Sequence, residues 1–362
     1  MIILYLTKLI GMVIDMSIKN RINRWKQLHD PNPDKKTIVF LINHPEYNNE
    51  IPILCAANKQ KRIDWAKRHY EWQINNTENY EDDSLPCLYP MTGTEIFAEA
   101  FGCDVIYPDN SLPFARPLIF DSKEVNKLKV PKLEDTPLMM LFDIVDELKR
   151  FAGNDTLVRL PDIQCPIDIS ALIWDKNDFF PSMIDTPEAI HELSDKVMEL
   201  MIVFLDEWFK KYGTSYVAHF PDYYMDGGIT MSTDEIGCVS PEMYRELFAG
   251  ELNVLSRRYG GIGIHCCADS KNQLENLKKI EGLKVLNLHR DWNLLHKVYD
   301  MFQDVCAQMH YTSDKDNITS SRNLTIEEID NELPEICRLI VPLGAQSVDH
   351  AKELADLYGK YR

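Results

Sequence analysis

The amino-acid sequence predicts an α/β fold in a single domain. Short apolar or β-branched runs recur along the chain, and amphipathic helices follow several of them. The runs do not alternate between apolar and polar residues, which is typical of strands buried on both faces of a parallel sheet. No internal repeat, low-complexity run or Gly/Ser linker divides the 362 residues, a length that suits one barrel with insertions.

Seven runs are the predicted strands. They are Thr37–Ile42, Thr156–Leu160, Ser215–His219, Ile262–Ile264, Lys284–Leu288, Val305–Met309 and Leu339–Leu343. With the helices between them they make six or seven strand–helix units. This favours a closed (β/α)8 TIM barrel, with a doubly wound open sheet as the alternative. No GxGxxG or GxxxxGKS pattern follows a strand, so nucleotide binding is disfavoured.

Three helix starts carry capping signals. Thr186–Glu188 and Ser240–Glu242 each place a hydroxyl residue before a proline, and Thr325 with Glu328 has the spacing of a capping box. Apolar residues recur at helical spacing after each start, so we assign these stripes to the core.

The charge and the cysteines limit the function classes. The formal net charge is −18, and such a surface repels phosphate backbones and anionic lipid, so we expect no nucleic-acid and no membrane partner. The nine cysteines are scattered and odd in number, which suits free or metal-binding thiols in a reducing compartment. We therefore predict a cytoplasmic protein.

Polar residues end several predicted strands. Because the carboxyl ends of parallel strands meet on one face, we expect these side chains to converge there. They are Asn43, His44, Asp162, His219, Asp222, His265, His289 and His310.

The segment Gly263–Asp269 carries the sharpest local signal. In His265-Cys266-Cys267 the chain is leaving a strand, so an imidazole and a thiolate can reach the same point. These donors suit Zn²⁺, which takes three or four nitrogen or sulfur ligands. Two ligands are only half a site, and buried thiols beside a structural histidine remain the alternative.

Several segments in order resemble the uroporphyrinogen decarboxylase and corrinoid methyltransferase superfamily. Ile262–Asp269 resembles its H-x-C-G segment, and the family's acidic pair, glycine and SPE helix start are similar to residues 231–244. Two further matching stretches are Thr94–Cys103, followed by Pro113 and Pro117, and Asp185–Glu188. The resemblance covers the chain from about Arg21 to its end, and it implies a (β/α)8 barrel with N-terminal helical additions.

The resemblance implies a zinc-dependent methyltransferase that uses a corrinoid on a partner protein. In that branch a His-x-Cys pair and a distant cysteine hold the zinc, which activates a substrate thiol. His265 and Cys267 match the pair, but Ala345 stands where the third ligand is expected. We expect His310 to replace it, with His289 and Cys306 as alternatives, and we expect Asp234 or Glu235 to support the metal or contact the small-molecule substrate.

Two other functions stay open. A cofactor-free decarboxylase would use Asp162, His219 or Asp222 as proton donor. The segment after the first strand has no arginine to grip a tetrapyrrole's carboxylates, so it would act on another acid. A non-catalytic corrinoid or small-ligand binding protein is the third reading. Relatives in this family often form dimers, so the resemblance also implies that a homodimer is possible.

Residues 1–15 form an apolar stretch before Met16. The stretch lacks a basic start and a cleavage site, and it is interrupted by Lys8 and Asp15, so it resembles neither a signal peptide nor a membrane span. We interpret it as a leader upstream of a start at Met16, with 16–362 as the barrel domain. Deleting residues 1–15 should leave a soluble protein with an unchanged far-UV circular dichroism spectrum, and an insoluble truncated protein contradicts this interpretation.

Overall fold

The structure is a computed structural model, and it describes residues 16–32, 34–44, 51–108, 112–314 and 317–362. The leader, residues 1–15, lies outside these ranges, so its deletion stays a prediction. Within the described residues, no helix has the length and apolar content needed to cross a membrane.

A helix over 16–28 precedes the first strand. In chain order the strands are β1 (Thr37–Asn43), β2 (Cys87–Leu88), β3 (Val105–Ile106), β4 (Phe114–Ala115), β5 (Leu157–Val158), β6 (Ser215–Val217), β7 (Tyr224–Asp226), β8 (Ile229–Ser232), β9 (Ile262–Cys266), β10 (Leu283–Asp291), β11 (Ala307–Gln308), β12 (Tyr311–Asp314), β13 (Asn317–Arg322) and β14 (Arg338–Gly344).

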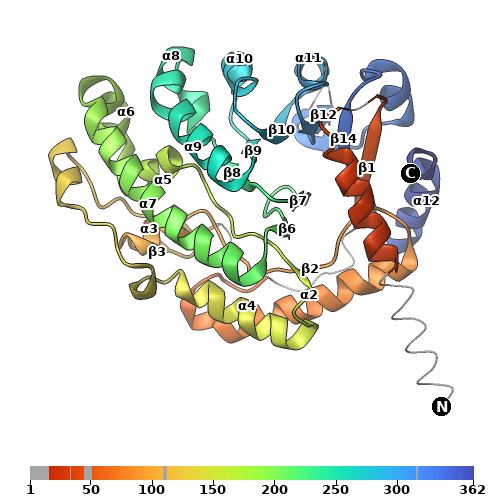
Figure 1. Cartoon of the computed structure of the whole chain (residues 1–362), viewed down its shortest axis with the longest axis horizontal. Coiled ribbons are helices and arrows are strands. Elements are labelled where there is room, and N and C mark those ends of the chain that lie inside the picture. Colours follow the sequence, from red (N-terminus) through yellow and green to blue (C-terminus); the bar gives the residue numbers. More distant parts are fainter. Residues whose placement is uncertain (1–15, 33, 45–50, 109–111, 315–316) are drawn as a thin grey trace.

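The helices after the first are α2 (Lys59–Asn79), α3 (Ile96–Ala100), α4 (Met139–Ala152), α5 (Pro166–Ile173), α6 (Lys176–Asp185), α7 (Pro187–Tyr212), α8 (Pro241–Met243), α9 (Ala249–Tyr259), α10 (Leu274–Leu277), α11 (Trp292–Phe302) and α12 (Val348–Tyr358). Helices lie on the outside of the strands (Figure 1).

Eight of the described strands follow one another around the barrel in chain order: β1, β2, β5, β8, β9, β10, β11 and β14. Parallel pairs join β8 to β9, β9 to β10, β10 to β11 and β11 to β14, and β14 pairs with β1. On the other side β2 pairs with β5, and Arg159 at the end of β5 bridges in parallel to Val217 of β6. A further parallel bridge joins Gln164, in the segment after β5, to Ser232 of β8. The first and last of these strands, β1 and β14, pair with each other. A (β/α)8 barrel has this pairing, whereas a doubly wound open sheet does not.

The approach to β2 is held against β1 by buried charges. The Asp83 backbone N–H donates to the Phe40 carbonyl, while the Asp82 and Asp83 carboxylates accept from the backbone of Ile42 and Phe40. Arg21, on the N-terminal helix, forms an ion pair with Asp82 over 2.5 Å, and both side chains are only 1% exposed. The N-terminal helical addition is therefore tied to the barrel wall.

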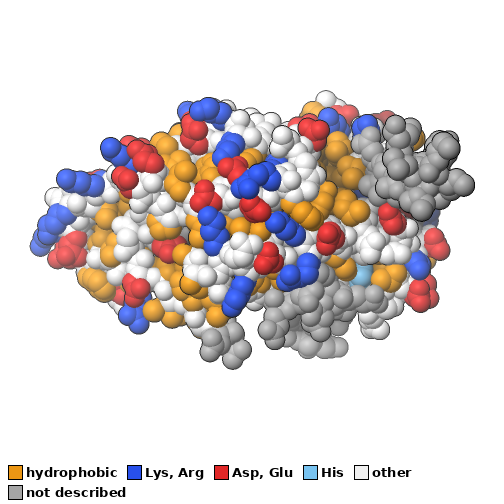
Figure 2. All heavy atoms as spheres, turned by 90° about the horizontal axis from the view of Figure 1, so that it is seen from below, with side chains coloured by type: hydrophobic (Ala, Val, Ile, Leu, Met, Phe, Trp, Pro, Cys, Tyr) orange, Lys and Arg blue, Asp and Glu red, His pale blue; other side chains and the backbone are white. Residues whose placement is uncertain are grey.

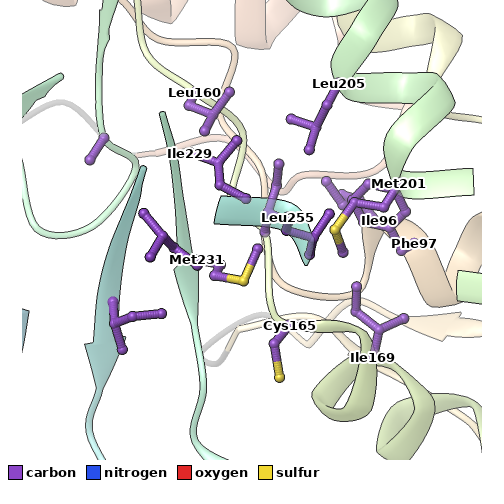
Figure 3. Close-up of a cluster of buried hydrophobic side chains, with 14 of the residues drawn as sticks. Ile96, Phe97, Leu160, Cys165, Ile169, Met201, Leu205, Ile229, Met231 and Leu255 are labelled. Atoms are coloured by element: carbon purple, nitrogen blue, oxygen red, sulfur yellow. The ribbon is translucent and has the colours of Figure 1, made fainter. Parts of the chain in front are cut away.

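The helices pack on the outward faces of the strands in a large apolar cluster, and a second buried cluster lies around β1, β14, α11 and α12. Side chains of α3, α5, α7 and α9 meet strand β8 in a buried cluster (Figure 3), which includes Ile96, Phe97, Leu160, Cys165, Ile169, Met201, Leu205, Ile229, Met231 and Leu255. Because side chains alternate along a strand, Thr230 and Ser232 point the other way, into the barrel.

The surface charge is mixed on the face that Figure 2 shows. Lysines and arginines lie among aspartates and glutamates there, rather than in a patch of one sign. The net charge of −18 is therefore not gathered on this face.

Two of the three predicted caps are confirmed. Ser240 accepts from the Met243 backbone N–H, and Thr325 and Glu328 bond reciprocally as a capping box. The third differs, because Thr186 occupies the N-cap position but its hydroxyl makes no capping bond. There the fixed backbone angle of Pro187 favours the helix start without a side-chain cap.

The predicted strand Ser215–His219 is confirmed over Ser215–Val217, which forms β6. A parallel bridge joins Val217 to Arg159 at the end of β5, and β6 also pairs antiparallel with β7 in a hairpin. Sequence patterns missed β2 and β8, whose apolar runs are too short to stand out.

The hairpin packs against a glycine inside the barrel. Gly263 lies on the same face of β9 as His265, two residues later, and a Cβ added at Gly263 would collide with the hydroxyl of Tyr223. Glycine at this position lets a buried tyrosine lie beneath the end of β9.

We expect Gly263→Ala to destabilise the protein by about 1–3 kcal/mol, because neither Tyr223 nor the strand can move without losing packing. Gly250→Ala is the matched control, since nothing lies within 4 Å of the added methyl group on α9. It should be neutral or stabilising by about 1 kcal/mol. Urea denaturation of both variants measures the difference, and equal effects of the two substitutions contradict the packing argument.

Candidate metal centre and acid–base pair

Asp234, His265 and Cys267 form a group that could hold a metal ion. Their ligand atoms all lie within 4.8 Å of one another. In tetrahedral zinc sites with bonds of 2.0–2.3 Å, ligand atoms lie about 3.5 Å apart, so only a small contraction is needed. Carboxylate, imidazole and thiolate are all zinc ligands, so the donor set fits this ion.

The pairing of β8 with β9 brings these residues together. Ser232 is in register with His265, so Asp234 and Cys267 each follow that pair by two residues. The backbone N–H of Cys267 donates to Asp234 Oδ1 over 2.8 Å, which fixes the carboxylate beside the thiol.

Cys267 carries a thiol that resists ionisation in the absence of a cation. Partial removal from water and then the Asp234 carboxylate raise the pKa of Cys267 to about 12. A divalent ion between these groups would reverse that preference, because metal-bound thiols are deprotonated.

His265 is held by a buried amide. The Nδ2 group of Asn287 donates to the Met309 carbonyl, so its Oδ1 is the atom that faces His265 Nδ1, at 2.5 Å. Nδ1 must therefore carry the proton, and the imidazole lone pair is on Nε2. Hydrogen bonds of this kind orient metal-binding histidines.

The hairpin between β6 and β7 covers one side of His265. The ring of Phe220 meets the His265 ring edge-on, with centroids 4.9 Å apart, and Phe220 is 48% exposed. An apolar and partly exposed side chain thus borders the candidate metal centre.

Asp168, on α5, anchors the loop that carries Asp234. Its carboxylate accepts from the backbone N–H groups of Asp234 and Glu235, at 2.5 and 3.3 Å. Burial raises the pKa of Asp168 to about 8. The carboxylate of Glu235 pairs with Lys176, so Asp234 is the member of the acidic pair that joins the metal group.

Asp162 and His219 form a second pair beside this group. His219 Nε2 lies 3.3 Å from Asp162 Oδ2. Burial, followed by the charges of Glu95 and Asp234, raises the pKa of Asp162 to about 7. Burial, Arg159 and His265 lower the pKa of His219 to about 3. The histidine is therefore neutral near pH 7, while the aspartate can hold or release a proton there.

The structure does not bring His310 into the metal group. The backbone N–H of Leu288 donates to His310 Nδ1 over 3.0 Å, so Nε2 carries the proton and donates to Gln308 Oε1, also at 3.0 Å. Both ring nitrogens thus serve buried hydrogen bonds. Cys306 is fully buried at the start of β11, and the side chain of His289 lies outside the described part of the structure.

Sequence reasoning missed three residues that shape the site. Asn287 and Asp168 each stand within an apolar run of the sequence and are buried. A buried polar side chain requires a hydrogen-bond partner, so a polar residue inside such a run is a sequence signal that could have indicated both. Phe220 had no such signal, because its position depends on the path of the hairpin between β6 and β7.

Comparison with known proteins gives one family and one fold. A family model described as uroporphyrinogen decarboxylase (URO-D) matches residues 71–309, more than half of the chain. Among solved structures, a methyltransferase from Methanosarcina mazei has a similar fold, with a TM-score of 0.60. The two chains are 11% identical, and the match covers 84% of this chain and 88% of that one. No curated protein matches the chain.

We expect Asp162→Asn to change how the free energy of unfolding depends on pH. The pKa of Asp162 is raised from 3.8 to about 7, so between these values the folded protein holds a proton that the unfolded chain releases. Wild-type stability therefore falls as the pH rises from about 4 to about 7, by roughly 4 kcal/mol in all and by roughly 3 kcal/mol above pH 5, and the variant lacks this loss. Urea denaturation at pH 5 and pH 8 tests this. A difference between the two proteins that is the same at both pH values contradicts the assignment.

Proposed function

Because the chain belongs to the uroporphyrinogen decarboxylase family, we propose that it is a zinc-dependent methyltransferase that moves a methyl group between a corrinoid and a thiol. The observation that carries the proposal is the group of Asp234, His265 and Cys267, with His265 oriented by Asn287. The name of the Methanosarcina mazei structure agrees with this reaction class.

Asp234 takes the place of the third ligand in this proposal. Ala345 stands where the family resemblance predicts a cysteine, and the carboxylate supplies an anionic ligand from the neighbouring strand end instead. Three protein ligands leave a fourth position for a substrate thiol. Zinc bound there supplies chemistry by lowering the pKa of that thiol.

Asp162 and His219 have a proton-handling role in the proposal. The pKa of Asp162 is about 7, and its charge is coupled to that of Asp234, so the pair can take up a proton released when a thiol binds nearby. Neutral His219 keeps Asp162 in place through its Nε2.

The exposure of the site suits a large methyl carrier. Cys267 is exposed and Phe220 is half exposed, so one side of the metal group is open to solvent. A corrinoid on a partner protein would approach from this side.

Metal analysis is the first test. We expect about one zinc per chain in the wild-type protein and little in Asp234→Ala, His265→Ala and Cys267→Ala. Asn287→Leu should weaken zinc binding by about 10- to 100-fold, because the histidine loses its orienting bond. Cys238→Ala is the control, since this exposed thiol on the loop after Asp234 is outside the metal group. Zinc retained by Asp234→Ala but lost from His310→Ala would refute the ligand set.

Methyl transfer is tested with free methylcobalamin and 2-mercaptoethanol. The thiolate sulfur forms a bond to the methyl carbon, the cobalt–carbon bond breaks, and its electron pair stays on cobalt. Spectroscopic appearance of cob(I)alamin with the wild-type protein, and its absence with Cys267→Ala, support the function. A zinc-loaded protein that binds the corrinoid without turnover would indicate the binding-protein alternative.

A decarboxylase is the second candidate, and one observation favours it. Asp162 is a buried acid with a pKa of about 7, and it lies against His219, whose own pKa is lowered to about 3. Such an acid could protonate a carbanion left by loss of carbon dioxide. Release of carbon dioxide that persists in Cys267→Ala and stops in Asp162→Asn would favour this reaction over methyl transfer.

A further inference from the structure

A second cavity, of about 180 Å³, lies between β1, α2 and the β6–β7 hairpin. Among the described strands, β2 pairs with β5 rather than with β1, and residues of β1 and of the segment before β2 both line the cavity. None of the residues of the candidate metal group lines it. A cavity of about 150 Å³ accommodates benzene, so this one has room for a benzene ring with a small substituent.

Aromatic rings form much of the apolar lining. Trp25, Tyr80 and Tyr224 are each at most 7% exposed, and Trp72 lies on the α2 side. The indole Nε1–H of Trp25 donates to the Asp83 carbonyl over 2.8 Å, so this side chain offers the cavity its ring rather than its N–H. Walls of this kind favour a flat ring, because aromatic pairs gain more than the burial of their area alone.

The four charged side chains among the described lining residues form two ion pairs. Arg21 lies 2.5 Å from Asp82, and both side chains are 1% exposed. Arg159 lies 2.8 Å from Asp222. A charged ligand would have to disrupt one of these pairs or stay uncompensated in a buried site, and both cost free energy. The lining therefore favours an uncharged occupant.

Other polar side chains of the lining add no charge and already bond within the protein. Burial lowers the pKa of His69 to about 3, so its ring is neutral near pH 7. The Thr77 hydroxyl donates to the Ile74 carbonyl over 2.7 Å. The Ser84 hydroxyl donates to the Asp82 carboxylate. A ligand that depended on several polar contacts would find these groups engaged.

We propose that this cavity binds an uncharged aromatic molecule of about the size of benzyl alcohol. The ring packs against Trp25, Trp72 and Tyr224. The substituent lies toward Asn43, an exposed lining residue at the end of β1, whose neutral amide can bond to a hydroxyl group. The inference goes beyond the proposed function, because it requires neither zinc nor a corrinoid.

The hairpin borders both this cavity and the candidate metal centre. Val217 in β6 and Tyr224 in β7 line the cavity, while Phe220, between these strands, meets the ring of His265. A ring bound in the cavity therefore packs against the hairpin that covers His265, and it would stabilise the hairpin in that position.

Benzyl alcohol is the probe. Benzoate and benzylamine are its anionic and cationic counterparts of similar shape, and cyclohexylmethanol is an uncharged counterpart that is not flat. Quenching of tryptophan fluorescence and isothermal titration calorimetry on the full chain measure binding. We expect one benzyl alcohol per chain, bound at least tenfold more tightly than either charged probe and at least threefold more tightly than cyclohexylmethanol. This comparison uses the wild-type protein, so it does not depend on the folding of a variant.

Thr77→Phe places a ring in the cavity from α2 and should weaken the binding of benzyl alcohol at least tenfold. Asn75→Phe is the matched control, because Asn75 is an exposed residue of the same helix that does not line the cavity. Far-UV circular dichroism checks that both variants fold.

Three results would overturn the proposal. They are no saturable binding of benzyl alcohol, binding of a charged probe or of cyclohexylmethanol that is as tight, and unchanged affinity in a folded Thr77→Phe protein. Binding of benzyl alcohol to zinc-free protein would leave the proposal standing even if the methyltransferase function fails.

Discussion

The parallel pairing of β8 with β9 places the candidate metal centre, because it brings two chain segments to the same height at the mouth of the barrel. Ser232 and His265 are opposite each other, and the chain continues for two residues beyond each. Asp234 and Cys267 consequently meet, and a backbone hydrogen bond holds them together. If the register between β8 and β9 shifted by one residue, His265 would point toward the helices, because side chains alternate along a strand. His265 would then be separated from Asp234 and Cys267.

Burial controls the charges around this centre. The chain is strongly acidic overall, yet two buried carboxyl groups near the site, those of Asp162 and Asp168, have pKa values raised toward neutrality. The neighbouring His219 is kept neutral by the same loss of water. Burial disfavours an isolated charge of either sign. A cation bound between Asp234 and Cys267 would stabilise their charged forms, because it would neutralise the carboxylate and the thiolate together.

The sequence predicted the barrel, and it named all three residues of the candidate metal group, with Asp234 in a supporting role rather than as a ligand. His265 and Cys267 could be found because only one residue separates them in the chain, and the family resemblance implied the fold. His310 was expected as a third ligand from its place at a strand end, whereas its nitrogens bond to Leu288 and Gln308. Hydrogen bonds between neighbouring strands depend on the strand register and on the direction of each side chain. Neither can be predicted from a short stretch of sequence.

The contact between Gly263 and Tyr223 also bears on how this protein can diverge. Strand β9 and the hairpin are separate in the chain, but the space left by a missing side chain in one is filled by an aromatic ring from the other. Neither position can accept a bulkier residue alone. Among relatives that keep the hairpin, the glycine and the tyrosine should be inherited as a pair, and a lineage that loses the hairpin can place a side chain beneath the histidine at the end of this strand.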